Sequence, residues 1–322
     1  MPTLSFTQRR QFEEEGFLIV ENVLDLDRDI APVMAEYAQV LDGIATILAD
    51  SGAISSAYKE MPFVARLIQV CVESGRNFPQ EFDISFPQTG VHHGTPIHVG
   101  PAVFGLLTNP HLLDLVEDLI GSEIYSNPVQ HIRMKLPMRA VAKTAYSGLV
   151  SRIPWHQDNG VILPEADHSN ILTVWMPLNE ATVQNGCLQV IPRSHRRDLY
   201  SHCPTEKGVA IPEPLLPLER ATPLPMCPGS VLLMTPRTVH GSLDNVTEHE
   251  VRMSFDLRYQ PIGQPTGRPA FPGFVARSAM HPAAVLRSPA EWARLWYEAR
   301  AKLAVQDTPS FNRWRAGVGV CA

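Results

Sequence analysis

Two side chains that commonly bind metals lie two residues apart in the segment Pro154-Trp-His-Gln-Asp158. In an extended strand, residues i and i+2 point to the same face, so His156 and Asp158 can converge on one metal ion. A neutral imidazole and a carboxylate, joined by a second histidine, form the facial triad that suits non-haem Fe(II) and leaves positions open for a chelating oxo-acid and O₂. H-x-D also occurs by chance, so the motif alone does not establish a metal site.

The second histidine of such a triad must come from a distant strand, and the chain has twelve histidines. His240 has the most favourable context, because it follows a turn and an apolar strand-like run, Pro228-Gly-Ser-Val-Leu-Leu-Met234. His195 lies among charged residues after a proline, and His168 and His202 lie in polar segments. We therefore expect His240 to complete the triad.

The segment 251–259 alternates strictly between apolar and polar residues, as in a strand with two different faces. Its polar face holds Arg252, Ser254, Asp256 and Arg258. A guanidinium group forms two parallel hydrogen bonds to one carboxylate, which lysine cannot do. We interpret Arg252 with Ser254 as a clamp for the distal carboxylate of 2-oxoglutarate, and Arg258 as a candidate substrate contact. The alternatives are a solvated face and an internal Asp256–Arg258 ion pair without a catalytic part.

Three histidines, His92, His93 and His98, lie in a segment without helical or strand periodicity, Gln88–His98. Loops over a rigid scaffold often carry specificity, and imidazole offers hydrogen bonds of either sense near neutral pH. We expect this loop to form part of the substrate entrance. The alternative is a solvated surface loop.

Hydrophobic spacing predicts helices first and strands afterwards. The predicted helices follow Ser5 and cover about 30–48, 63–72, 112–119 and 289–303. From about residue 124, short β-type runs alternate with turn residues, at 124–125, 129–134, 171–175, 188–191, 231–234 and 251–259. This order predicts a mainly β fold, a barrel or jelly roll with flanking helices. We expect one domain, 1–322, with a helical support (1–123), a β core (124–262) and a C-terminal extension (263–322).

The composition excludes several classes of protein. A net charge of −6 gives no basic field for nucleic acid. No apolar run is long enough to span a membrane, and the N-terminus lacks the apolar core of a signal peptide. The chain has five cysteines and no C-x-x-C pair, which predicts reduced thiols in a cytoplasmic protein. The oligomeric state is left open.

Four segments, in order, resemble the phytanoyl-CoA dioxygenase (PhyH) family of Fe(II)/2-oxoglutarate-dependent oxygenases. The resemblance covers about 150–260, and linked motifs are more specific than one H-x-D. The segments are Trp155-His-Gln-Asp-Asn-Gly160, Leu172-Thr-Val-Trp-Met-Pro-Leu-Asn179, Asn185-Gly-Cys-Leu-Gln-Val-Ile-Pro-Arg-Ser-His195 and His240 to Tyr259. The segment 137–152 looks longer than in close relatives.

The resemblance implies a double-stranded β-helix core (a jelly roll, cupin-like), Fe(II), and 2-oxoglutarate that is converted to succinate and CO₂ as O₂ is activated. By position, His156, Asp158 and His240 match the iron ligands, and Arg252 matches the co-substrate clamp. Trp175 matches a tryptophan beside 2-oxoglutarate, with a barrel-core aromatic as the alternative. His131 falls where relatives place another co-substrate contact.

We therefore expect hydroxylation of an aliphatic C–H bond of a small metabolite, since the chain has no obvious basic cluster for the phosphates of coenzyme A. Halogenating relatives replace the carboxylate at Asp158, which disfavours halogenation here. Desaturation, cyclisation and epimerisation need the same residues and stay open. Alternatives of other classes are a Zn/Mn cupin isomerase or hydrolase, which needs no arginine clamp, and an inactive binding module.

Overall fold

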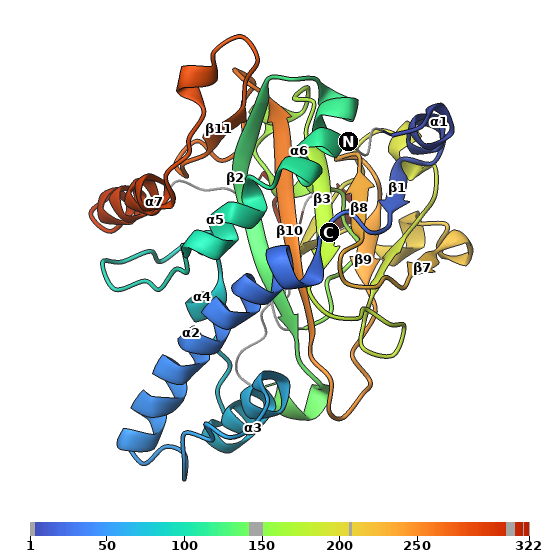
Figure 1. The fold of residues 1–322 in the computed structure, drawn as a ribbon. Coiled ribbons are helices and arrows are strands. Elements are labelled where there is room, and N and C mark those ends of the chain that lie inside the picture. Colours follow the sequence, from blue (N-terminus) through green and yellow to red (C-terminus); the bar gives the residue numbers. More distant parts are fainter. Residues whose placement is uncertain (1–3, 142–150, 206–207, 307–312, 318, 322) are drawn as a thin grey trace.

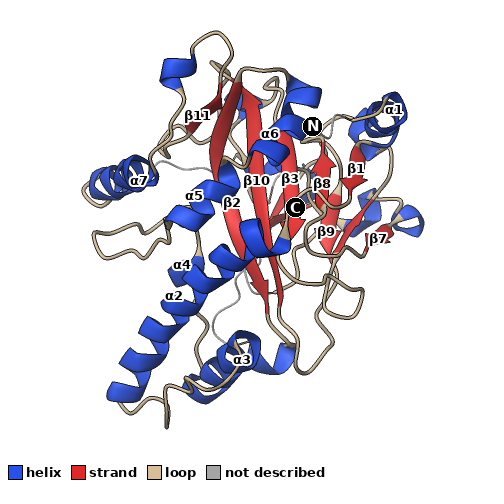
Figure 2. Cartoon of the chain, viewed as in Figure 1, coloured by secondary structure: helices blue, strands red, loops and turns tan. Residues whose placement is uncertain are grey.

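The computed structural model describes residues 4–141, 151–205, 208–306, 313–317 and 319–321. These residues form a six-stranded and a three-stranded antiparallel sheet, and helices flank the larger sheet (Figures 1 and 2). The prediction of a sheet-rich fold with flanking helices is confirmed. The long segment at 137–152 lies largely outside the described residues, because 142–150 are not among them.

The predicted helices are all present in the structure. Before the first long strand they are α1 (Phe6–Glu15), α2 (Ala31–Asp50), α3 (Phe63–Ser74), α4 (Pro79–Phe82), α5 (Pro101–Leu107) and α6 (Pro110–Ile120), and α7 (Pro289–Leu303) follows the sheets. Ser5 and Gln8 form a reciprocal capping box at the start of α1. The helix ends at Gly16, whose left-handed backbone has no room for a side chain beside His195. Of the α-helices in the described residues, the short helices α4 and α5 were not predicted.

The strands are β1 (Phe17–Val20), β2 (Ile124–Lys135), β3 (Leu172–Pro177), β4 (Leu188–Val190), β5 (Cys203–Thr205), β6 (Gly208–Ala210), β7 (Thr222–Leu224), β8 (Val231–Met234), β9 (His240–Ser242), β10 (Arg252–Pro261) and β11 (Phe274–Arg277). The larger sheet has the order β1-β8-β3-β10-β2-β11, the smaller one β7-β4-β9, and β5 pairs with β6. The register of β10 sets Arg252 opposite Lys135, and Asp256 opposite both His131 and Trp175.

The two faces of β10 are both buried but differ in their surroundings. Met253, Phe255, Leu257 and Tyr259 belong to the main apolar core. Phe255 packs on Tyr37 of α2, and the Tyr259 hydroxyl donates to a carbonyl oxygen at the end of α5. The apolar face therefore meets the helices in front of the sheet in Figure 1. The polar face points to the other side and is not solvated, since all four of its residues are at most 5% exposed.

The backbone at the H-x-D motif differs from the prediction. His156 forms only an isolated antiparallel bridge with His240, and Asp158 begins a 3-10 helix, Asp158–Val161. Gln157, between them, has extended backbone angles, with φ −113° and ψ 142°. The expectation of a regular strand was wrong. The extended residue between the two side chains still lets both reach one metal position, because their ligand atoms lie within 4.8 Å of each other.

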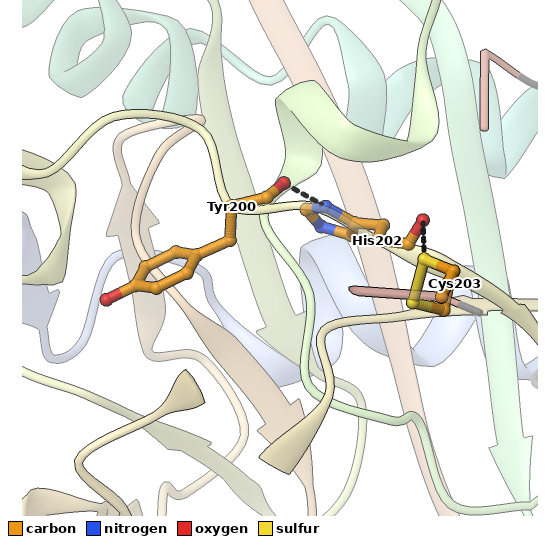
Figure 3. The surroundings of a disulfide bond; sticks show 4 residues. Tyr200, His202 and Cys203 are labelled. Carbon is orange, nitrogen blue, oxygen red and sulfur yellow. Dashed lines mark hydrogen bonds between the residues drawn. A yellow bond between two sulfur atoms is a disulfide. The ribbon is translucent and has the colours of Figure 1, made fainter. Parts of the chain in front are cut away.

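The prediction of five reduced cysteines was also wrong. Cys203, at the start of β5, forms a disulfide with Cys321, 118 residues further along the chain (Figure 3). Cys71, Cys187 and Cys227 are free thiols. No short-range spacing could reveal this bond, because it depends on the C-terminal segment returning to the β5–β6 hairpin.

No helix among the described residues is long and apolar enough to cross a membrane.

Candidate metal centre

The three predicted ligands come together at the rim of the smaller sheet. His156 and His240 exchange two backbone hydrogen bonds of 2.9 Å, and their ring centroids lie 4.2 Å apart. One donor atom from each of His156, Asp158 and His240 lies within 4.8 Å of the other two. All three side chains are buried. The start of β9 therefore supplies His240, the isolated bridge beside it supplies His156, and the turn after His156 supplies the carboxylate.

Backbone carbonyl groups fix the orientation of both imidazoles. Nδ1 of His156 donates to the carbonyl of Pro154 (2.9 Å), and Nδ1 of His240 donates to that of Thr238 (3.0 Å). A carbonyl oxygen only accepts, so the proton must lie on Nδ1, and Nε2 is left as the metal-binding atom. Burial, followed by the neighbouring His240, lowers the pKa of His156 to about 3. His156 is therefore neutral at physiological pH, as a metal ligand must be.

Asp158 is held as an ionised carboxylate. Its Oδ1 accepts a hydrogen bond from Arg258, and its Oδ2 accepts one from the hydroxyl of Thr173 on β3. Burial alone would raise the pKa of Asp158, but Arg258 and the two histidines lower it well below its usual range. Arg258 and Thr173 thus act as supports for a ligand, of the kind that orients metal-binding carboxylates.

This donor set fits iron. Two imidazoles and one carboxylate, with no further His, Cys, Asp or Glu in the cluster among the described residues, match the two-histidine, one-carboxylate pattern of non-haem Fe(II). His195 instead lies beside α1 and bonds Glu13, and His202 accepts a hydrogen bond from the backbone of Gln157. Neither histidine belongs to the triad.

Arg252 is fully buried on β10 beside the triad's sheet. Its Nε donates to the carbonyl of Gly186 (3.2 Å), and its Nη1 donates to the hydroxyl of Ser254. Its guanidinium carbon lies 5.5 Å from the ring centroid of Trp175. Nη2 of Arg252 and Nε1 of Trp175 have no hydrogen-bond partner in the described part of the chain. Two such buried donors mark a place for an acceptor that the described residues do not supply.

The structure adds two residues that the sequence analysis missed, Lys135 and Ser242. Lys135 is 2% exposed and donates to the hydroxyl of Ser242 and to the carbonyl of Leu243. Burial, followed by the nearby Arg252, lowers the pKa of Lys135 to about 6. Gly186 leaves the space that the Lys135 chain occupies. The signal was present in β2, where His131, Arg133 and Lys135 alternate with apolar residues and so share one face.

A cavity of about 350 Å³ opens beside the triad. Its wall includes His156 and Arg258, and His131 and Arg133 from β2. Nδ1 of His131 lies 2.8 Å from a carboxylate oxygen of Asp83. His131 therefore borders the cavity with one of its two ring nitrogens already in contact with a partner.

The histidine loop contributes Gln88 to the cavity wall, but none of its histidines lines the cavity. His92 and His93 are exposed. His98 packs on Tyr37 and lies 3.1 Å from a carboxylate oxygen of Glu36, which ties the loop to α2. The structure therefore does not bring these three side chains together with the triad.

Arg258 does line the cavity, but most of its hydrogen-bonding capacity is used inside the protein. It donates to Asp158 and to the carbonyl of Val129 (2.8 Å), and it lies 3.8 Å from Asp256. The Asp256–Arg258 ion pair that we considered as an alternative is present. The same arginine also supports a metal ligand.

Residues from chain segments that are far apart in sequence pack around the triad. Gln157 points away from the triad and bonds Arg237 and Tyr200 through its side-chain amide. His202 takes the place that a side chain at Gly160 would fill. Figure 3 shows His202 between Tyr200 and the disulfide. Cys203 of the disulfide therefore directly follows His202, which is in contact with the metal-binding turn.

A buried triad of two histidines and one carboxylate on an antiparallel β fold defines a non-haem iron oxidoreductase of the dioxygenase class. The family model of phytanoyl-CoA dioxygenase (PhyH) matches residues 12–254, and the chain belongs to this family. Its cofactor is Fe(II), and its co-substrates are 2-oxoglutarate and O₂.

Individual relatives are distant. A probable phytanoyl-CoA dioxygenase from Caenorhabditis elegans is 27% identical over 76% of this chain and 72% of its own length. An ectoine dioxygenase from Bordetella bronchiseptica is 23% identical over 76% and 71%. The crystal structure of EvdO2 from Micromonospora carbonacea var. aurantiaca, complexed with 2-oxoglutarate, is similar with a TM-score of 0.52 and 22% identity, over 83% of this chain and 96% of that one. This last similarity shows a shared fold.

Proposed function

We propose that this chain hydroxylates an aliphatic C–H bond of a small metabolite, with 2-oxoglutarate converted to succinate and CO₂. In this proposal His156, Asp158 and His240 hold the iron, and Arg252 with Ser254 binds the distal carboxylate of 2-oxoglutarate. One observation carries the proposal: a buried arginine, whose Nη2 has no hydrogen-bond partner among the described residues, lies on the same polar strand face as the support of the metal-binding carboxylate. A cupin isomerase or hydrolase would have no use for that arginine.

The charge of the proposed clamp matches a dicarboxylate. Arg252 and Lys135 lie on paired positions of β10 and β2. Burial, followed by Arg252, lowers the pKa of Lys135 to about 6, and burial, followed by Arg133, lowers the pKa of Arg252 to about 9. A protonated Lys135 and Arg252 would repel each other in a medium of low dielectric constant, so Lys135 is mostly neutral in the empty site above pH 7. An anion between them removes this penalty and supplies the acceptor that Nη2 lacks. Trp175, whose ring faces Arg252, would form one wall of the co-substrate site.

The protein's part in the reaction is positioning. Bound Fe(II), with 2-oxoglutarate, supplies the oxidising chemistry by which O₂ is activated. Arg258 and Thr173 keep the Asp158 carboxylate ionised and oriented, and the carbonyl groups of Pro154 and Thr238 set the imidazoles. His131, on the cavity wall, is proposed as a further contact of the co-substrate.

Two organisational expectations belong to the same proposal. We infer that the two sheets form a double-stranded β-helix around the triad, and that the chain is one oxygenase domain. The paired sheets and the bridge between His156 and His240 support this inference. We still predict that the histidine loop forms part of the substrate entrance, and Gln88 in the cavity wall supports this prediction.

The test is an anaerobic titration of the iron-loaded protein with 2-oxoglutarate, followed by visible absorption. Chelation of Fe(II) by the oxo-acid should produce a weak charge-transfer band, while succinate, which cannot chelate in that way, should not. The band should need about tenfold more 2-oxoglutarate in Arg252→Lys, because a forked contact becomes a point contact. A wild-type protein that binds iron but gives no band would refute the proposal.

A further inference from the structure

The backbone of the metal-binding turn is held by two side chains of the C-terminal segment. Arg313 donates from Nη1 to the carbonyl of Asn159 (3.2 Å), and Trp314 donates from Nε1 to the carbonyl of Gly160 (2.6 Å). Asn159 and Gly160 are both buried, and they directly follow Asp158, the proposed carboxylate ligand, in its 3-10 helix. The C-terminal segment therefore bonds the two peptide carbonyl groups that come next after the ligand.

The residue before Asp158 is held by His202, which contacts the same segment. Nδ1 of His202 donates to the carbonyl of Tyr200 (2.8 Å), so Nε2 is left to accept from the backbone N–H of Gln157 (2.9 Å). The ring is fully buried and stacks on Trp314, with ring centroids 5.2 Å apart and planes inclined by 25°. The turn is thus held on both sides of the ligand by groups that also pack on each other.

The C-terminal segment is itself anchored at two places. Arg313 pairs with Asp167 through both terminal nitrogens, at 2.5 and 2.7 Å, and the two side chains are only 13% and 27% exposed. Cys321 is bonded to Cys203, which directly follows His202 (Figure 3). A paired, charge-assisted contact of this kind fixes the direction of a guanidinium group. The donors that reach the turn therefore have a defined position.

We propose that Arg313 and Trp314 are positioning residues of the metal centre, which keep Asp158 where its carboxylate can bind iron. This inference rests on the proposed function, because it takes Asp158 as a metal ligand. Arg258 and Thr173 bond the two carboxylate oxygens. The position of that carboxylate also depends on the backbone that carries it, and the C-terminal segment holds this backbone.

The expected effect is on metal affinity. A buried carbonyl that loses its donor is costly, so the turn should shift until the carbonyl finds another partner. Metal binding must then restore the position of the ligand, and part of the binding free energy is lost. Loss of the groups that orient metal ligands typically lowers metal affinity about 10–100-fold. Both positioning residues lie outside the range 12–254 that the family model matches.

The experiment measures the binding of Co(II), which replaces Fe(II), by titration of its visible absorption bands. Trp314→Phe keeps an aromatic ring against His202 but loses the donor, and it should weaken Co(II) binding about tenfold. Arg313→Met should have a similar effect, and the double variant a larger one. Circular dichroism should show the wild-type fold in each variant. Wild-type affinity in the double variant would overturn the inference.

The disulfide provides the matched control. Cys203→Ser with Cys321→Ser destabilises the same segment but leaves the hydrogen bonds of Arg313 and Trp314 in place. Its affinity for Co(II) should stay within about twofold of the wild type at a temperature well below unfolding. An equal loss of affinity in this control would mean that the stability of the segment is responsible, and the proposed role of the two side chains would be wrong.

The affinity for 2-oxoglutarate distinguishes positioning of the turn from a general loosening of the site. The proposed clamp, Arg252, bonds Gly186 and Ser254 and not the turn. In metal-saturated Trp314→Phe, the affinity for 2-oxoglutarate should therefore stay within about threefold of the wild type. A fall as large as that for Co(II) would contradict the inference.

Asp158→Ala separates this inference from the proposed function, and it should weaken Co(II) binding at least about 100-fold. Wild-type affinity in Asp158→Ala would remove Asp158 from the metal site, and both ideas would fail. Loss of binding in Asp158→Ala, together with wild-type binding in Trp314→Phe and Arg313→Met, would remove the inference alone.

Discussion

Replacing both cysteines of the disulfide, by Cys203→Ser with Cys321→Ser, should lower the free energy of unfolding substantially. The bond closes a loop across 118 positions and anchors the C-terminal segment to β5. In the chain-entropy description, opening a loop of this length costs about 5 kcal/mol. That figure is an upper limit, because removed disulfides cost about 2–4 kcal/mol in most proteins.

The C-terminal segment has other contacts that should remain when the bond is lost. Arg313 forms a two-pronged ion pair with Asp167, at 2.5 and 2.7 Å. Trp314 donates to the carbonyl of Gly160 (2.6 Å) and stacks on His202 with ring centroids 5.2 Å apart. These contacts preserve the native arrangement, so the loss acts mainly through the unfolded chain. We therefore expect a decrease of about 2–4 kcal/mol.

The assay is urea unfolding of the purified protein without reductant, followed by tryptophan fluorescence. Cys227→Ser, which changes an exposed free thiol, is the control and should unfold like the wild type. Thiol titration in denaturant should find three thiols before reduction and five after it, since two of the five cysteines are in the bond. Five thiols before reduction, or a double variant within about 0.5 kcal/mol of the wild type, would contradict the reasoning.

Three further predictions concern the site. His156→Ala or His240→Ala should reduce succinate production below about one-tenth of wild type with the fold retained in circular dichroism, because metal affinity depends on every ligand. Arg252→Lys should raise the apparent KM for 2-oxoglutarate at least about tenfold in steady-state assays, while Arg277→Lys should not. Binding of 2-oxoglutarate at pH 8 should take up about one proton by calorimetry in two buffers, because the pKa of Lys135 is about 6 in the empty site and a bound anion raises it. The uptake should fall to about half near pH 6 and should be absent in Lys135→Met.

The parts of the site that lie on regular strands could be predicted from the sequence. Strict alternation along 251–259 placed Arg252 and Ser254 on one face, and the structure has them hydrogen-bonded to each other. The context of His240, after an apolar strand-like run, predicts it as the second histidine, and it is in contact with His156. In each case a local pattern determines the direction of a side chain, because alternate residues of a strand point to opposite faces.

The remaining features depend on contacts between distant segments. The role of Lys135 depends on its pairing with Arg252 on the neighbouring strand and on its hydrogen bond to Ser242 in the other sheet. His98 contacts Glu36 on α2 and does not line the cavity, although its neighbours in sequence resemble those of a binding loop. The disulfide joins segments 118 residues apart. None of these pairings has a local signature, so a single sequence cannot supply them.

The polar face of β10 links the two halves of the proposed site. Arg252, at one end, faces the proposed co-substrate position, and Arg258, six residues on, holds Oδ1 of Asp158. Thr173 binds the other oxygen of the same carboxylate. Each carboxylate oxygen has two lone pairs, so Oδ1, which lies 3.9 Å from Nε2 of His156, can accept from Arg258 and still bind a metal. A single strand therefore sets the distance between the metal-binding carboxylate and the clamp, and a shift of its register by one residue would turn both arginines away from the site at once.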